Sequence, residues 1–133
     1  MLCSRFHENH PSFIGVVREI WTGIRGDSIQ NLLADVRFPH KPSKVYSLQT
    51  FDTPVNDGEN FAQRLKGYFV APKTGEYKFY SSCDDECEVF LGLDGKEGEN
   101  NRIISQRRSS MHNEFDRLVL GIIIKKKSFN IDH

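Results

Sequence analysis

The sequence predicts a mostly β domain, built from antiparallel strands with one short helix, and three observations lead to this expectation. Runs of β-branched and aromatic residues are short and end at Gly or Pro. Only one stretch spaces its apolar residues as a helix does. The 133 residues include 10 Phe, 4 Tyr and 1 Trp, which supply the core of a single domain. Several short strands separated by turns are typical of a sandwich or a barrel.

The first elements are a strand and a short helix. The stretch Gly15 to Trp21 is rich in β-branched and aromatic residues, which favours a strand. From Asp27 to Val36, four apolar residues fall at helical spacing, and Asp27 or Ser28 can cap the first turn. Phe38-Pro39 ends this pattern because the residue before proline avoids the helical region. We therefore expect helical structure only around residues 28 to 35.

The following segments are predicted strands. Val45 to Phe51 forms one of them. Phe61 to Val70 and Glu76 to Ser81 are aromatic-rich runs on either side of the Pro/Gly turn Ala71 to Gly75, which predicts a β-hairpin. Glu88 to Leu93 follows as a further strand.

The predicted domain covers residues 14–117, and residues 1–13 and 118–133 are flanking segments of uncertain structure. Within the second flank, Leu118 to Ile124 is an apolar run of strand length, followed by three lysines. This run is either a buried edge strand with a solvated end or foreign sequence attached to a truncated domain.

Composition argues against several functions. Eighteen basic residues balance eighteen acidic ones, whereas nucleic-acid binders need a basic excess to neutralise phosphates. No apolar stretch approaches the roughly 20 residues of a membrane span. The first ten residues lack the apolar centre of a signal peptide, so export is expected only as part of a longer protein. No nucleophile elbow, phosphate-binding glycine loop or zinc-protease motif is present, so we expect no enzyme.

The acidic pair Asp84-Asp85 is the candidate site. It lies on a loop between two predicted strands, and neighbouring carboxylates suit Ca²⁺, which takes about six to eight oxygen ligands. An ordinary solvated acidic loop is the alternative. Cys83 and Cys87 bracket the pair, and they form either a disulfide or two free thiols. None of the five histidines stands at a spacing that would make a zinc site with them.

The order of the motifs resembles the protective-antigen (PA-fourteen) family, particularly its fibrocystin-like animal members. The resemblance runs from Gly15 to about Asp116. Its specific part is Arg64 to Pro72 continuing into Thr74 to Tyr80, followed by Asp84-Asp85 leading to Glu88 to Leu91. The other matching marks are Gly15 with Glu19-Ile20-Trp21, Ile24-Arg25-Gly26, Leu32-Leu33, Phe38-Pro39 and Phe115-Asp116.

The resemblance implies a β-sandwich, as found in toxins, glycosidases, fungal adhesins and animal surface proteins. In the carbohydrate-binding fungal members, adjacent aspartates hold a Ca²⁺ ion that grips sugar hydroxyls. By that resemblance Asp84 and Asp85 are the metal and ligand-binding residues. The family's closing motifs, a second Gly-x-Tyr strand and a terminal Gly-Trp, are absent after Asp116, so an incomplete sandwich is expected.

The expected function is therefore non-catalytic recognition of a glycan or a surface glycoprotein, with Ca²⁺ as the cofactor. The expected location is extracellular or at the cell surface, within a longer protein. The alternatives are a purely structural or protein-interaction module and an accessory domain of a glycosidase.

Overall fold

A computed structural model describes residues 12–54, 57–92, 100–107, 119–124 and 128–132 of the chain. The described elements are β1 (Ser12–Thr22), α1 (Ile29–Leu33), β2 (Lys44–Leu48), β3 (Phe61–Val70), β4 (Gly75–Phe79), β5 (Cys87–Gly92), β6 (Asn100–Gln106), β7 (Val119–Ile124) and β8 (Ser128–Asp132). All strand pairs are antiparallel. The prediction of a mostly β, antiparallel fold is confirmed, and among the described residues α1 is the only α-helix, inside the predicted region.

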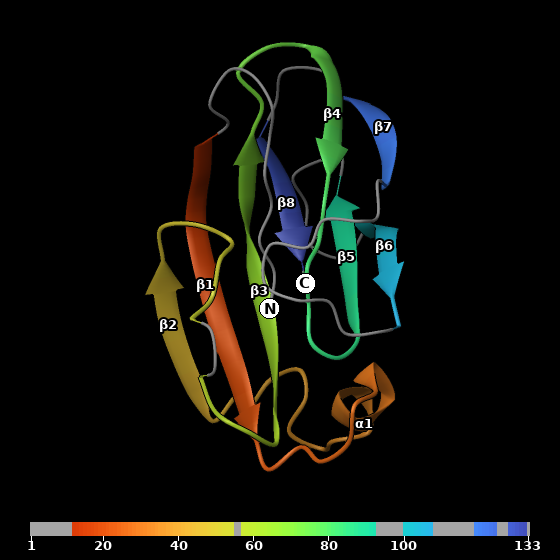
Figure 1. Ribbon diagram of the computed structural model, residues 1–133. Coiled ribbons are helices and arrows are strands. Elements are labelled where there is room, and N and C mark those ends of the chain that lie inside the picture. Colours follow the sequence, from red (N-terminus) through yellow and green to blue (C-terminus); the bar gives the residue numbers. More distant parts are fainter. Residues whose placement is uncertain (1–11, 55–56, 93–99, 108–118, 125–127, 133) are drawn as a thin grey trace.

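The strands form two sheets. The larger has six strands in the order β2-β1-β3-β8-β5-β6, and the smaller contains β4 and β7 (Figure 1). The small sheet packs on the large one through Phe69 of β3. The ring of Phe69 meets Tyr77 and Phe79 of β4 edge-on, with centroids 5.2 and 5.4 Å apart. The sandwich of the resembling family stays a prediction.

The predicted hairpin of residues 61–81 is wrong, although both of its strands exist. β3 pairs with β1 along one edge and with β8 along the other, so no edge of β3 is left for β4. β4 instead crosses to the second sheet and pairs with β7. The alternating aromatic residues that suggested neighbouring strands face each other between the two layers. The alternation of apolar and polar residues along a strand indicates which face of the strand is buried, but it does not indicate which strand lies beside it.

The region after residue 118 supplies two strands. β7 pairs with β4, which agrees with the interpretation of Leu118 to Ile124 as a strand. β8 lies between β3 and β5 and pairs with both. The chain thus forms two strands after Asp116, although it lacks the closing motifs of the resembling family. Both strands fall in the segment 118–133, whose structure the sequence left uncertain.

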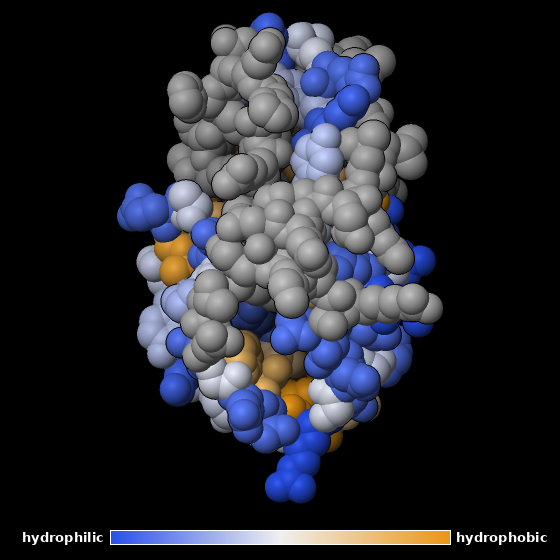
Figure 2. Space-filling model, viewed as in Figure 1, coloured by the Kyte–Doolittle hydropathy of each residue, from blue (hydrophilic) through white to orange (hydrophobic). Residues whose placement is uncertain are grey.

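Two apolar clusters hold the described part of the chain together. The first lies between the sheets and contains Val16, Phe51, Leu65, Phe69, Ala71, Tyr77, Phe79, Val89, Leu91 and Ile104. The second contains Trp21, Ile24 and Leu32, with Phe38 and Ala62 packed against it. Trp21 is fully buried, which supports its assignment to the core. In Figure 2 a small apolar patch, surrounded by hydrophilic residues, reaches the surface at the lower end of the molecule.

The short helix buries little of its predicted apolar face. Leu32 is buried in the second cluster, whereas Leu33 is half exposed and Val36, beyond the helix, is 97% exposed. The helix ends too early for Val36 to share its face. Ser28 is the N-cap, and its Oγ accepts a hydrogen bond from the amide of Gln30. The predicted cap is therefore confirmed at Ser28.

Charged residues of β1 are buried beside its apolar ones. Glu19 accepts from Arg64 of β3 at 2.7 Å and lies 3.4 Å from the ammonium of Lys66. The Arg64 guanidinium lies over the rings of Trp21 and Phe38, at 5.7 and 5.4 Å from their centroids. The ion pair thus covers one side of the second cluster.

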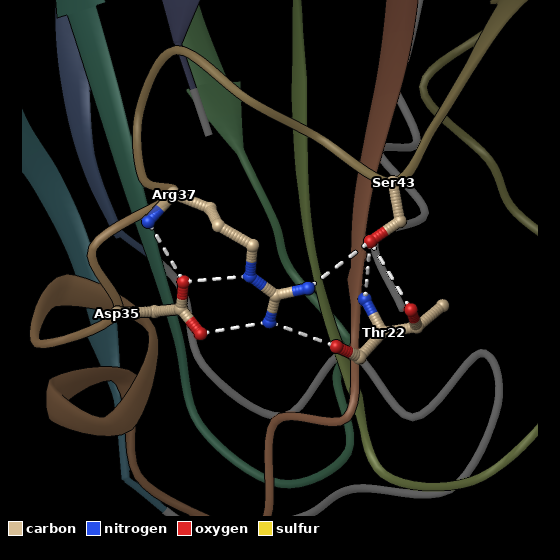
Figure 3. A network of polar contacts seen from close by, with 4 residues as sticks. All are labelled: Thr22, Asp35, Arg37 and Ser43. Atoms are coloured by element: carbon tan, nitrogen blue, oxygen red, sulfur yellow. Dashed lines mark hydrogen bonds and ion pairs between the residues drawn. The ribbon is translucent and has the colours of Figure 1, made fainter.

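Arg37 ties the segment after α1 to the end of β1 (Figure 3). Its guanidinium donates to both carboxylate oxygens of Asp35, at 2.8 and 2.7 Å, and to the carbonyl of Thr22 at 2.9 Å. Ser43 completes the network, because its Oγ accepts from the Thr22 amide at 3.1 Å and from Arg37 Nη1 at 3.4 Å. Hydrogen bonds from the Arg37 side chain and backbone lower the pKa of Asp35 from 3.8 to about 2.

This network is expected to give stability a specific acid dependence. A lowered folded-state pKa stabilises the fold above pH 3.8, and that contribution disappears as the pH falls through about 2. The free-energy difference between wild type and Asp35→Asn should therefore be present at neutral pH and shrink between pH 4 and pH 2. Urea unfolding at several pH values measures it. In an Arg37→Ala background the same substitution should lose most of this pH dependence, because only the backbone hydrogen bond from residue 37 to Asp35 remains. An unchanged pH dependence there would contradict the assignment.

Candidate functional site

The acidic loop, residues 83–87, connects the segment after β4 to the first residue of β5. Figure 1 shows this connection turning below the lower end of β5, next to α1. Cys83 and Cys87 are buried, whereas Asp84 and Asp85 between them are exposed. The apolar alternation of β5, in which Cys87, Val89 and Leu91 are buried, fixes one end of the loop. The predicted placement of the acidic pair, on a loop between strands, is thus what the structure shows.

The two cysteines form a disulfide, with their Cα atoms 6.2 Å apart. Of the two alternatives left open by the sequence, the structure has the disulfide and not the free thiols. The closed loop has five residues when both cysteines are counted, and its closure holds Asp84 and Asp85 at a defined place on the surface. The peptide bond between these two aspartates is cis.

Negative charge gathers around Asp85. Partial removal of its carboxyl from water and a hydrogen bond with Asp84 raise the pKa of Asp85, and the charges of Asp84, Asp27 and Glu86 raise it further. The ionised form of Asp85 is therefore disfavoured by its neighbours. A bound cation would reverse this by favouring the ionised form.

Two members of this cluster were not identified from the sequence. Asp27 precedes the N-cap of α1, and Glu86 reaches the same helix from the acidic loop. The Glu86 carboxylate accepts from Ser28 Oγ at 3.1 Å and from the Ile29 amide at 3.0 Å. Ser28 and Glu86 are 58 residues apart, so no local pattern could have revealed the contact.

Asn100 or Asn101, backbone carbonyls and water are the alternatives for the remaining oxygen ligands of a calcium ion, and the backbone register separates the two asparagines from the loop. In the β5–β6 register Cys87 stands opposite Gln106, whereas Leu91 and Gly92 stand opposite Asn101 and Asn100. Four residues of strand span roughly 13 Å. The two asparagines therefore stand opposite the other end of β5, away from Asp84 and Asp85, which leaves backbone carbonyls and water as the remaining alternatives.

Within the described ranges, no three His, Cys, Asp or Glu side chains are grouped so that they could hold a metal ion. Nor does the described part of the chain contain a helix with the length and apolarity of a membrane span. Comparisons of the chain with family models, with curated proteins and with solved structures found no match.

Proposed function

We propose that the chain is a non-catalytic recognition module of the protective-antigen type, and that Ca²⁺ binds at Asp84 and Asp85. The observation that carries the proposal is the presentation of two adjacent, exposed carboxylates on a disulfide-closed loop, with Asp27 and Glu86 adding negative charge. Such an arrangement attracts a hard cation because the ion relieves the repulsion among the carboxylates.

The two aspartates supply at most part of a calcium shell. Ca²⁺ takes about six to eight oxygens, so backbone carbonyls, water or hydroxyls of a ligand must provide the remainder. An open shell of this kind suits recognition, since the sugar hydroxyls of a glycan can complete the coordination. The carbohydrate partner, a glycan or surface glycoprotein, follows from the resemblance to the adhesins.

The disulfide also supports an extracellular or cell-surface location. Disulfides persist in oxidising compartments and are rare in the cytosol. In an oxidising compartment of this kind, the Cys83–Cys87 disulfide would keep the loop of the proposed module closed.

Calorimetric titration with CaCl₂ tests the site. The oxidised chain is expected to bind with a dissociation constant of about 10⁻⁴ to 10⁻³ M, which is typical of extracellular calcium modules. The double variant Asp84→Asn/Asp85→Asn should bind at least tenfold more weakly, because both charged ligands are lost. The matched control Asp52→Asn/Glu59→Gln removes two exposed carboxylates elsewhere and should bind as the wild type does.

Equal heats for wild type and Asp84→Asn/Asp85→Asn would remove these aspartates from any metal role. The structural or protein-interaction module would then be the better interpretation. A glycan array read with CaCl₂ and with a chelator tests the carbohydrate partner. Chelator-sensitive signals that the Asp84→Asn/Asp85→Asn variant lacks are the expected result.

A further inference from the structure

The disulfide fixes the backbone on both sides of Glu86. Cys87 follows Glu86 directly and is held in β5, where it pairs with Gln106 of β6. Cys83 closes the loop from the other side, and both cysteines are 4% exposed or less. The backbone of Glu86 therefore has little freedom while the sulfur–sulfur bond is intact.

Glu86 connects this loop to α1. Its Oε2 accepts from the hydroxyl of Ser28 and from the amide of Ile29, the first residue of the helix. A carboxylate in this place satisfies an amide that has no partner within the helix, and it interacts favourably with the helix dipole. One side chain of the loop thus caps a helix from a distant part of the sequence.

The helix has little else to hold it. It has five residues, far fewer than a helix needs to be stable by itself. Leu32 is its one residue that is buried. The contact with Glu86 therefore contributes a large share of what keeps the first turn of α1 in place.

The charges of the loop oppose its closure. Asp84, Asp27 and Glu86 all act unfavourably on the charge of Asp85. Like charges at close range repel, and the covalent bond between the cysteines holds the loop closed against that repulsion. Once this bond is broken, the repulsion favours a more open loop that draws Glu86 away from the helix.

We propose that the Cys83–Cys87 disulfide is a redox-sensitive clamp that keeps Glu86 on the first turn of α1. A dithiol breaks the bond between the two sulfur atoms by giving up two electrons and two protons. Cys83 and Cys87 become thiols, and the dithiol becomes its own cyclic disulfide. The loop then opens, the hydrogen bond to the Ile29 amide is lost, and the start of α1 unwinds. The clamp goes beyond the proposed calcium site and does not depend on it.

Hydrogen exchange of backbone amides in the full chain tests the clamp, read by NMR with and without dithiothreitol and with no calcium present. Reduction should speed exchange of the Ile29 amide by about tenfold or more, as expected when a hydrogen bond to a charged acceptor is lost. Amides of the β1–β3 ladder should keep their protection. Intact mass establishes the redox state of each sample.

Two variants make the result specific. Cys83→Ser/Cys87→Ser should show the fast Ile29 exchange without dithiothreitol and should not respond to it. Glu86→Gln, with the disulfide intact, should speed Ile29 exchange through a weaker acceptor while the β1–β3 amides stay protected. Unchanged Ile29 exchange after reduction would overturn the clamp. So would an equal loss of protection in the β1–β3 ladder, since that would report general unfolding. A failed calcium titration would leave these outcomes unaffected, because they are measured without the ion.

Discussion

Replacing Phe69 by alanine is expected to lower the free energy of unfolding by about 3–5 kcal/mol, the usual cost of removing a buried aromatic side chain. Phe69 is fully buried on β3, and its ring contacts Tyr77 and Phe79 of the second sheet. The substitution would open a cavity where the two sheets meet and remove two edge-on ring contacts. Urea unfolding followed by circular dichroism measures the effect.

The neighbouring residue provides the control. Tyr68 is on the same strand, but its side chain is among the exposed large apolar ones. Tyr68→Ala should lower the free energy of unfolding by clearly less than Phe69→Ala does, because Tyr68 is 36% exposed whereas Phe69 is fully buried. If the two variants were equally stable, Phe69 would not join the sheets as described.

The second large effect is expected at Glu19. Glu19→Ala should lower the free energy of unfolding by about 3 kcal/mol, because it removes a mostly buried carboxylate that Arg64 and Lys66 both contact. The Glu19 side chain is 11% exposed and also lies near Lys66, so two cations would then face each other across the vacated position. Chemical unfolding of the variant measures the loss.

An exposed ion pair in the same sheet serves as the reference. Arg102 of β6 donates to Glu88 of β5 at 2.8 Å, and the Arg102 side chain is 53% exposed. Arg102→Ala should lower the free energy of unfolding by less than about 1 kcal/mol, and added salt should weaken this effect. If Glu19→Ala and Arg102→Ala lowered the free energy of unfolding equally, the buried ion pair of Glu19 would contribute no more than the exposed one.

The sequence predicts strands better than their partners. β-branched and aromatic runs identified β1, β2, β3, β4 and β5 because side-chain alternation is a local property. Pairing depends on contacts between distant segments, so the turn at residues 71–75 suggested a hairpin that the sheets do not contain. The position of β8 between β3 and β5 had no counterpart in any local pattern.

In the candidate site, too, the sequence predicts the local features but not the contacts between distant segments. The exposed loop with Asp84 and Asp85 follows from acidic residues between two strand patterns, and the cap at Ser28 follows from a short polar residue before a helical pattern. The link between Glu86 and the helix depends on how the chain folds back over 58 residues. The burial of Glu19 also has no local sequence signal, since charged residues are usually exposed.

The place of β8 has a consequence for assembly of the fold. In the six-stranded sheet, β8 is the piece that joins the β2-β1-β3 half to the β5-β6 half. Before it arrives, β3 and β5 each offer a free edge with the same hydrogen-bonding pattern that β8 later uses. The corresponding strand of another molecule has the same sequence and could make the same backbone hydrogen bonds in that gap. Exchange of β8 between two copies during concentrated refolding would thus produce a swapped dimer with the same internal contacts.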